Sequence, residues 1–281
     1  MNFGGHEVVY DYLNSAIVIL PVPYDATSTW MKGADKGPDA ILEASPNLEF
    51  YDIETRSEAH LHGIFTLDPI NESGSPEELV NSVQSKVSLL ITEKKFPVIL
   101  GGNHTVSIGS IRAFGEKYRN LSVLQLDAHS DLRIEYEGSE LNHACAMARA
   151  REVAPVVQVG IRSMSAEELP FADWDKIYPA HRLYYEKDLY SKALESLTDD
   201  VYITIDLDVF DPSLMPSTGT PEPGGPDYYE IMHFLRDVAE KRNVVGFDVV
   251  ELCPNPANKM PDFVAAKVIY QLLSYIFSKR R

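Results

Sequence analysis

Residues 121–131 of this chain read LSVLQLDAHSD, and this stretch indicates the fold class more directly than any other part of the sequence. The first six residues are mainly Leu and Val and form too short a run for a helix. A short apolar run of this kind is typical of a strand buried on both faces, as in a parallel sheet that helices cover. Polar side chains begin at Asp127, where the strand is expected to end.

Five further short runs of aliphatic and β-branched residues resemble the first one, and longer amphipathic stretches separate them. Strands are therefore also predicted at residues 16–20, 97–100, 156–159, 201–205 and 244–250. Helices are predicted at residues 76–94, 106–118, 166–174, 185–197, 227–241 and 262–277. Strands that alternate with helices predict βα units and a mainly parallel sheet, which leaves a three-layer αβα sandwich and a TIM barrel open.

No internal repeat and no low-complexity linker interrupts this alternation. A cluster of Gly and Pro at residues 216–226 lies between a predicted strand and a predicted helix, which is typical of a structured loop. We therefore expect a single domain over residues 1–281. The apolar fraction of 44% is sufficient for a sizeable core in a chain of this length, which argues against disorder.

The chain is acidic, since 25 Lys and Arg residues against 42 Asp and Glu residues give a formal charge of −17. Nucleic acids and anionic membrane surfaces are bound by basic patches, so neither is expected as a partner. The charge favours a small cationic ligand, although many proteins are acidic for solubility alone. No apolar stretch reaches the roughly 20 residues needed to span a bilayer.

Cysteine usage and the first residues indicate the compartment. Cys145 and Cys253 are too few for a disulfide framework and are not spaced as zinc ligands. Residues 1–10 lack the basic and apolar regions of a signal peptide. A reducing, cytoplasmic location is therefore expected. Cys145 is interpreted as a packed thiol, because the sequence supplies no dedicated base for it.

Side chains of the types that bind metals follow four of the predicted strands, at the point where each strand ends. The carboxyl ends of parallel strands meet at one edge of the sheet, and ligands bind there in this class of fold. The residues are therefore expected to converge in space. They are His104, Asp127, His129, Asp131, Asp206, Asp208 and Glu251.

Alternation along an extended chain would point Asp127, His129 and Asp131 to one side, and Asp206 and Asp208 likewise. Carboxylates gathered in one pocket repel one another unless a cation neutralises them, and two cations would do so better than one. Four carboxylates and two imidazoles form a mixed hard and borderline ligand set. This set suits Mn²⁺, with Zn²⁺, Ni²⁺ or Fe²⁺ as alternatives.

Simpler interpretations explain less of this pattern. An Asp-x-Asp pair by itself occurs most often in a surface loop or a helix cap. An EF-hand beginning at Asp206 lacks Gly at its sixth and Glu at its twelfth position, which hold Asp211 and Ser217. The pair Gly101 and Gly102 is not followed by the Lys and Ser or Thr of a phosphate-binding loop. Three alternating polar groups directly after an apolar strand would be unfavourable if they were buried without a ligand.

Three segments together resemble the signatures of the ureohydrolases, the family of arginase and agmatinase. They are residues 101–105 (GGNHT), 127–131 (DAHSD) and 206–212 (DLDVFDP), and residues 21–40 resemble the family's N-terminal loop. The resemblance continues to the last predicted helix and covers nearly the whole chain. It implies a three-layer αβα sandwich with a central, mainly parallel sheet, as one ureohydrolase domain over residues 1–281. It also implies a homo-oligomer, either a trimer or a hexamer.

The resemblance implies a centre of two Mn²⁺ ions or of two other divalent cations. One ion would be held by His104, Asp127, Asp131 and Asp206, and the other by Asp127, His129, Asp206 and Asp208. A water between two such ions would attack the carbon of a guanidinium group, with release of urea and a primary amine. The implied partner is therefore a small cationic guanidino compound.

The resemblance also assigns roles beside the ions. Asp131 would pass a proton to the leaving nitrogen, and His143 would shuttle protons from a mobile loop. Glu251 would pair with the guanidinium through charge-assisted hydrogen bonds. Thr220 matches a position that often contacts the guanidinium, although a structural turn fits it nearly as well.

Two positions indicate the substrate. Arginases have an Asn that holds the α-carboxylate and an Asp that helps to read the α-amino group, where this chain has Arg133 and Ser163. With residues 142–144 (NHA) and 216–221 (PSTGTP), these positions resemble the agmatinase branch. That branch implies hydrolysis of agmatine to putrescine and urea in polyamine biosynthesis.

Other substrates and functions stay open. Arg133 would instead bind the carboxylate of guanidinobutyrate or another guanidino acid if such a compound is the substrate. Aminopropylagmatine is a further alternative. A non-catalytic metal-binding homologue and an Asp-x-Asp sugar-nucleotide transferase explain the pattern less well.

One position departs from the family's pattern. The first signature usually has Asp or Glu where this chain has Asn103. We expect the residue at this position to orient the His104 imidazole from behind. Asn in its place predicts weaker metal binding or a changed metal preference.

Overall fold

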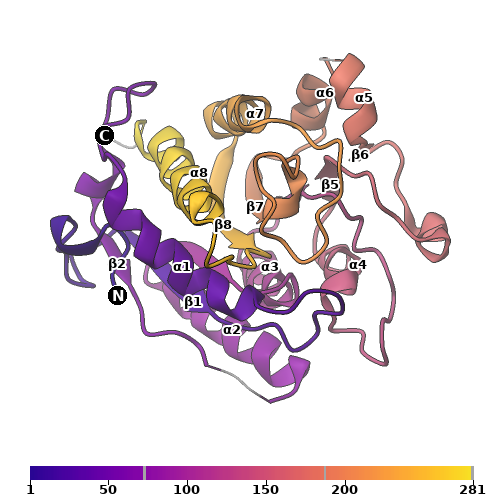
Figure 1. Ribbon diagram of the computed structural model, residues 1–281, viewed down its shortest axis with the longest axis horizontal. Coiled ribbons are helices and arrows are strands. Elements are labelled where there is room, and N and C mark those ends of the chain that lie inside the picture. The colour runs from indigo at the N-terminus through magenta and orange to yellow at the C-terminus, as the bar shows by residue number, and fades with distance from the viewer. Residues whose placement is uncertain (72–73, 187, 280–281) are drawn as a thin grey trace.

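The computed structural model describes residues 1–71, 74–186 and 188–279, and a parallel sheet of eight strands runs through it (Figure 1). The strand order is β2-β1-β3-β8-β7-β4-β5-β6, and every neighbouring pair is parallel. The strands are β1 (Ile17–Val22), β2 (Ile64–Thr66), β3 (Phe96–Gly101), β4 (Leu121–Leu126), β5 (Val156–Val159), β6 (Ile177–Tyr178), β7 (Asp200–Asp206) and β8 (Asn243–Val250). Because β2 and β6 form opposite edges, the sheet is open and the TIM barrel is excluded.

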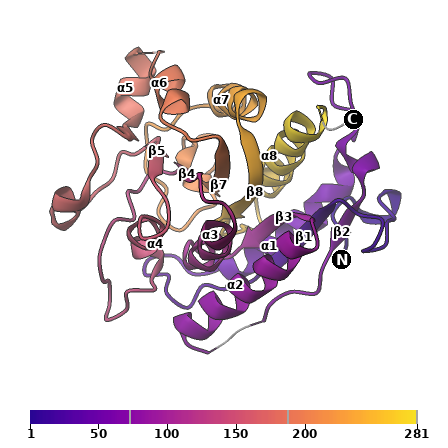
Figure 2. The ribbon, with the colours of Figure 1, turned by 180° about the vertical axis from the view of Figure 1, so that it is seen from behind.

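Helices cover both faces of the sheet, so the molecule is a three-layer αβα sandwich, as predicted. The helices are α1 (Gly37–Ala44), α2 (Pro76–Thr92), α3 (Thr105–Lys117), α4 (Ala146–Ala150), α5 (Ala180–Tyr185), α6 (Leu189–Glu195), α7 (Tyr228–Lys241) and α8 (Met260–Phe277). Apolar side chains of α1, α6, α7 and α8 belong to the core on one face. Those of α2, α3 and α4 belong to the core on the other face, which Figure 2 shows from behind.

The predicted strands agree closely with the observed ones. Residues 121–126 and 156–159 form β4 and β5 with the predicted bounds, and the other four strands differ by one or two residues at their ends. The edge strands β2 and β6 and the helices α1 and α4 were not predicted, and only the last residue of α5 falls in a predicted helix. The two edge strands have three residues and two residues, which is too short to give a periodic pattern.

Two predicted helices differ from the structure. Residues 166–174 were expected to be a helix, and Ala166–Phe171 is a 3-10 helix instead, because Pro170 in its interior lacks the N–H that a longer α-helix would use. Residues 185–197 divide between the end of α5 and α6, and residue 187 of that range lies outside the described residues.

Side chains at the first turns fix where two of the longer helices begin. The N–H of Glu78 donates to Oγ of Ser75 over 3.2 Å, and the N–H of Ser75 donates to Oε2 of Glu78 over 2.8 Å. Asp227 and Glu230 make the same reciprocal pair before α7. These capping boxes satisfy backbone N–H groups that have no partner within the helix.

The strand order places the functional residues. The strands β3, β8, β7 and β4 lie side by side at the centre of the sheet. Their carboxyl ends lead into His104, Glu251, Asp206 and Asp127. Residues that are far apart in the sequence therefore meet at one edge of the sheet, as the parallel arrangement predicts.

A close approach of two strand ends explains the glycine that follows β3. The N–H of Gly102 donates to the Val22 carbonyl over 2.9 Å, and the N–H of Asn103 donates to the Tyr24 carbonyl over 2.7 Å. A Cβ atom on Gly102 would lie 2.0 Å from that Tyr24 oxygen. Glycine is therefore required by packing at the edge of the site, and not by a phosphate.

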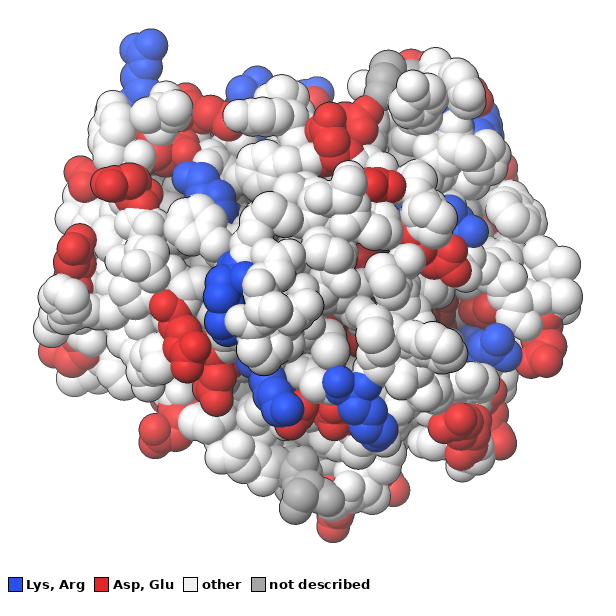
Figure 3. Space-filling model, in the orientation of Figure 1, with Lys and Arg blue, Asp and Glu red and all other residues white. Residues whose placement is uncertain are grey.

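The surface carries both signs of charge. On the face shown in Figure 3, Asp and Glu side chains are spread around the molecule among Lys and Arg side chains. No single acidic patch dominates this face. Among the described helices, none combines the length and the apolar character needed to cross a bilayer.

Candidate metal centre

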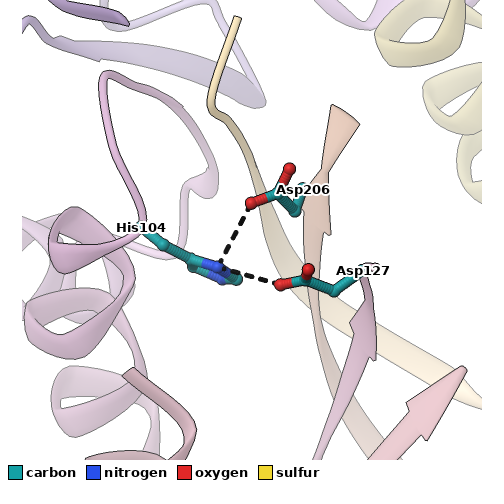
Figure 4. A group of neighbouring side chains, drawn as sticks. All are labelled: His104, Asp127 and Asp206. Carbon is teal, nitrogen blue, oxygen red and sulfur yellow. Dashed lines mark ion pairs between the residues drawn. The ribbon is translucent and has the colours of Figure 1, made fainter. Parts of the chain in front are cut away.

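His104 and three carboxylates surround a common point at the carboxyl edge of the sheet. His104 precedes α3, and its Nδ1 lies 3.2 Å from Oδ2 of Asp127, 3.0 Å from Oδ2 of Asp131 and 3.5 Å from Oδ2 of Asp206. Figure 4 shows His104, Asp127 and Asp206 pointing toward one another from three different elements. Ligand atoms of these three lie within 4.8 Å of one another, a spacing at which they could hold a metal ion.

A second group overlaps with the first one. Nδ1 of His129 lies 2.9 Å from Oδ2 of Asp208 and 3.7 Å from Oδ1 of Asp127. Asp127, His129 and Asp208 also have ligand atoms within 4.8 Å of one another. Asp127 belongs to both groups and faces one imidazole with each of its carboxylate oxygens. The structure therefore brings all six predicted metal-ligand residues together.

The carboxylates of Asp131 and Asp206 are directed toward the centre by local turns of the backbone, and not by an extended chain. Asp131 has a left-handed backbone with φ of 52°, and its carbonyl accepts hydrogen bonds from Met147 N and Ala148 N. Asp206 caps the 3-10 helix Leu207–Val209, and its Oδ1 accepts the N–H of Asp208 over 2.9 Å. The expectation of strict alternation at these positions is therefore wrong, although the side chains do converge.

Glu168 holds the turn that contains Asp131 and was not identified from the sequence. Its buried carboxylate accepts hydrogen bonds from Ser130 Oγ over 2.6 Å, Leu132 N over 2.8 Å and Ser165 N over 2.7 Å. The Ser165–Glu168 spacing is that of a capping box and is a signal by which this residue could have been found.

The carboxylates of the two groups carry more negative charge than the nearby imidazoles can balance, and their pKa values show this repulsion. Burial and the neighbouring Asp208 and Asp127 raise the pKa of Asp206 well above its ordinary value. Burial and the Asp127 charge raise the pKa of Asp131 to about 6. Burial would also raise the pKa of Asp127, but the two adjacent imidazoles outweigh it and hold that pKa below its ordinary value. Additional positive charge at the centre would relieve this repulsion, as a divalent cation does.

The opposite side of the His104 ring fixes which nitrogen faces the carboxylates. Nε2 lies 2.9 Å from Oγ1 of Thr204, and that hydroxyl donates to Oδ1 of Asp248 over 2.6 Å. Tyr202 donates to the other oxygen of Asp248, also over 2.6 Å. Because Thr204 gives its only proton to Asp248, Nε2 of His104 must be the donor to Thr204. Although burial opposes it, the carboxylates of Asp127 and Asp131 raise the pKa of His104 well above its ordinary value, so Nδ1 carries a proton when no cation is bound. A metal ion would displace that proton and bind the Nδ1 lone pair.

This arrangement fits a metal ion. Nδ1 of His104 is buried and makes no hydrogen bond of good geometry within the described part of the chain, although three carboxylates lie around it. A lone pair and several carboxylate oxygens aimed at one point are ligands for a cation. Thr204 and Asp248 were not singled out in the sequence, although an Asp inside the apolar run 244–250 was a signal of a buried polar network.

The role expected for Asn103 is not the one observed. Its Nδ2 donates to Oγ1 of Thr27 over 2.6 Å and to Oγ of Ser28 over 3.1 Å, and its Oδ1 accepts the N–H of Thr105 over 3.3 Å. The partner behind the His104 imidazole is Thr204. Asn103 therefore fastens the loop at residues 27–28 instead of orienting the ring.

A cavity of about 190 Å³ opens over the two groups. Its lining includes the metal-binding candidates His129, Asp131, Asp206 and Asp208, and the other predicted site residues Arg133, His143, Thr220 and Glu251. Thr220 is exposed at the rim, between Gly219 and Pro221. Trp30 and Met31 also line the cavity and were not singled out in the sequence.

Glu251 is a partly buried acid beside the first group. It has a left-handed backbone with φ of 66°, and its Oε1 accepts the N–H of His104 over 2.8 Å. Burial raises the pKa of Glu251 to about 8, against the opposing effect of that backbone N–H. A cationic group that reaches this carboxylate would restore its negative charge, so the position suits recognition of a cation.

His143 lies at the start of the 3-10 helix His143–Cys145, which Asn142 caps. Its Nδ1 is buried and has no hydrogen-bond partner among the described residues. Burial lowers the pKa of His143 to about 4, and the positive charges of His104 and His129 act in the same direction.

The neighbouring Cys145 has none of the features of a reactive thiol. It is fully buried, and burial raises the pKa of its thiol to about 12. This agrees with the interpretation as a packed thiol.

Fold and site together define a class: an α/β protein with an open parallel sheet and a candidate two-metal centre at its carboxyl edge. The chain belongs to the arginase family, whose family model matches residues 15–274. This confirms the resemblance seen in the three signatures.

Individual relatives cover nearly all of the chain. It is 36% identical to the N(1)-aminopropylagmatine ureohydrolase of Synechocystis sp., over 96% of this chain and 92% of that protein. It is 32% identical to the agmatinase of Pyrococcus horikoshii, over 94% of this chain and 93% of that protein. The crystal structure of agmatine ureohydrolase of Thermoplasma volcanium matches with a TM-score of 0.91 at 30% identity, over 99% of this chain and 95% of that one.

Proposed function

We propose that this protein hydrolyses a guanidino amine to urea and a primary amine at a two-metal centre. The observation that carries the proposal is the pair of overlapping donor groups that share Asp127, beneath a cavity that Glu251 also lines. Membership of the arginase family and the ureohydrolase relatives support it.

The proposed metal ligands are the two donor groups extended by Asp131 and Asp206 to the ligand sets that the resemblance to the family implies. His104, Asp127, Asp131 and Asp206 would hold one ion, and Asp127, His129, Asp206 and Asp208 the other. The mixed carboxylate and imidazole set suits two Mn²⁺ ions. When bound, two such ions lower the pKa of a shared water toward neutrality and stabilise developing negative charge.

Three residues of the chain act on the substrate. Glu251 binds and orients the guanidinium, with Oε1 already held by the N–H of His104. Asp131 holds a proton at its carboxylate for the leaving nitrogen. His143 lines the cavity, its Nδ1 has no hydrogen-bond partner among the described residues, and it exchanges protons between the site and water.

Agmatine, which would give putrescine, is the substrate we propose. Aminopropylagmatine is the second candidate, favoured by the identity with the Synechocystis ureohydrolase. With either compound the protein would act in polyamine biosynthesis in the cytoplasm. We further propose one ureohydrolase domain over residues 1–281, assembled as a trimer or a hexamer.

Urea release by Mn²⁺-loaded protein tests the proposal. The panel is agmatine, aminopropylagmatine, L-arginine, guanidinobutyrate and formiminoglutamate, with Asp208→Asn and Asp211→Asn as matched variants. Asp211 belongs to the same segment, but its carboxylate accepts from Ser213 N and Gly224 N outside both donor groups. We expect urea from agmatine or aminopropylagmatine, loss of activity in Asp208→Asn and retention in Asp211→Asn. Absence of urea from every compound, with two metals bound per chain, would overturn the proposal.

A further inference from the structure

One loop forms the wall of the cavity that carries His143. The N–H of Arg133 donates to the Ala144 carbonyl over 3.1 Å and joins the two ends of the loop. Between these ends, Tyr136 and Ser139 exchange two backbone hydrogen bonds of 3.0 and 3.1 Å. Arg133, Tyr136 and His143 therefore project from one closed loop, and all three line the cavity.

Arg133 already has two partners within the chain, at the surface of the cavity wall. The centre of its guanidinium lies 4.7 Å from the centre of the Tyr136 ring, over the face of that ring. Its Nη1 lies 3.1 Å from Oε2 of Glu167. One face of the guanidinium is thus covered by an aromatic ring, and one edge is occupied by a carboxylate. A carboxylate on a substrate would have to compete with Glu167.

Tyr136 in turn contacts His143. The two rings lie 6.1 Å apart at 83°, in an edge-to-face arrangement. A hydrogen bond also joins the backbone of Tyr136 to the residue before His143, because Nδ2 of Asn142 donates to the Tyr136 carbonyl over 3.2 Å. The ring that stacks on Arg133 is therefore also the ring that packs against the imidazole.

Nδ1 of His143 makes no hydrogen bond of good geometry with any described residue, and the backbone of Thr27 is a polar group that interacts with the imidazole. A histidine that moves protons is commonly oriented by an acceptor on its second nitrogen. Among the described residues, Nδ1 of His143 has no such partner. Ring packing against Tyr136 therefore restricts rotation of the imidazole together with the contact to the Thr27 backbone.

We infer that Arg133 and Tyr136 are a positioning pair for His143, anchored by Glu167, and that Arg133 does not receive a substrate carboxylate. This inference rests on the proposed function and narrows it to guanidino compounds without a carboxylate at this wall. Guanidino amines fit this requirement, whereas guanidino acids would leave Arg133 with two competing carboxylates.

Four variants test the pair. Tyr136→Leu removes the ring, Tyr136→Phe keeps the edge-to-face contact, and Arg133→Gln removes the stacked cation. Glu140→Gln is the matched control, because Glu140 pairs with Arg149 over the same 3.1 Å distance, and its carboxylate is exposed like that of Glu167.

Kinetics with agmatine and guanidinobutyrate give the first readout. We expect Tyr136→Leu and Arg133→Gln each to lower kcat for agmatine about tenfold with KM nearly unchanged, a part of what a positioned proton-transfer group contributes. Tyr136→Phe retains most of kcat. The double variant is no slower than Tyr136→Leu alone, because both changes act through one ring. Glu140→Gln leaves kcat unchanged.

Histidine resonances give a readout that needs no turnover. In metal-free protein labelled with ¹³C-histidine, the His143 signals are assigned by their loss in His143→Gln. We expect them to shift in Tyr136→Leu and in Arg133→Gln, and to stay in place in Glu140→Gln. If the wild type releases no urea, the proposed function fails, and these spectra still decide whether the pair holds the ring.

Two results would overturn the inference. One is an unchanged set of His143 signals in Tyr136→Leu and Arg133→Gln. The other is an Arg133→Gln variant with normal kinetics on agmatine and a raised KM for guanidinobutyrate, which would make Arg133 a receptor for a carboxylate.

Discussion

At the scale of single residues, Asp127 connects the two halves of the candidate centre. Its Oδ2 lies 3.2 Å from Nδ1 of His104, and its Oδ1 lies 3.7 Å from Nδ1 of His129. Glu251 lies beside this centre and contacts the backbone of His104 instead of its ring. Substitutions can therefore separate recognition of the substrate from retention of the metals.

Glu251→Gln should impair substrate recognition while the metals stay bound. The amide can still accept the N–H of His104, but it carries no charge for a guanidinium. A hydrogen bond to a charged group contributes about 1.5–3 kcal/mol, so kcat/KM for agmatine should fall roughly 10- to 100-fold. Steady-state kinetics together with metal analysis check this. A kcat/KM within twofold of the wild type would contradict the role given to Glu251.

Thr204→Val should weaken metal binding, because it removes the hydroxyl that joins His104 to Asp248. Loss of a partner behind a ligand typically weakens metal affinity about 10- to 100-fold. Thr204→Ser keeps the hydroxyl and should stay close to the wild type. Calorimetric titration with Mn²⁺ measures the difference.

The Mn²⁺ affinity of Asn103→Asp should be measured in the same calorimetric titration and compared with that of Thr204→Val. Asn103 bonds to the hydroxyls of Thr27 and Ser28 and not to the His104 ring, so its effect on affinity should be smaller than that of Thr204→Val. If Asn103→Asp changes the metal affinity more than Thr204→Val does, the residue at position 103 orients the His104 ring after all, and this prediction is wrong.

At the scale of elements, the ends of β1 and β3 meet so closely that only glycine fits at position 102. A Cβ atom there would lie 2.0 Å from the oxygen and 2.6 Å from the nitrogen of Tyr24. The turn that follows β3 carries His104, so displacement of this turn would reach the site.

Gly102→Ala should therefore lower the free energy of unfolding by about 3 kcal/mol, the upper part of the range for overpacked positions. Gly219→Ala is the control, because a Cβ atom there would meet its nearest neighbours at 3.6 and 3.7 Å, which is ordinary contact. Urea denaturation of both variants checks the difference. Equal midpoints would contradict the close approach.

At the scale of the whole molecule, the strand order gathers charge at one place. The strands β3, β8, β7 and β4 are neighbours, so the residues that follow them bring several buried carboxylates to one cavity. Their mutual repulsion raises the pKa of Asp206, Asp131 and Glu251, in addition to the effect of burial. The folded state therefore gains from any cation that binds there.

Removal of divalent metal should lower the thermal stability of the protein. A ligand at 100 times its dissociation constant stabilises the folded state by about 2.7 kcal/mol. For a chain of this size, we expect chelation to lower Tm by roughly 5–10 °C and added Mn²⁺ to restore it. Asp208→Asn should lose most of this response. A Tm that does not depend on metal would contradict a resident metal centre.

The sequence by itself determined the fold class and predicted which residues converge at the candidate centre. The runs that became β4 and β5 were located with the observed bounds, because most residues of a strand buried on both faces are aliphatic. The metal-binding residue types directly after four strands predicted their convergence at one edge. The resemblance to the ureohydrolases then predicted the same architecture as the observed three-layer sandwich.

Tertiary structure alone decided how these residues are aimed and supported. Asp131 reaches the centre through a left-handed turn, and the partner of His104 is Thr204 instead of Asn103. Arg133 is engaged by Glu167 and Tyr136. These contacts join residues that are far apart in the sequence, so the periodicity of a single strand or helix does not predict them. Thr204 and Asp248 are 44 positions apart, and His104 and Glu251 are 147 apart. Only strand order and packing bring such pairs together, because the period of a strand or a helix specifies a buried face and not the residue that will lie against it.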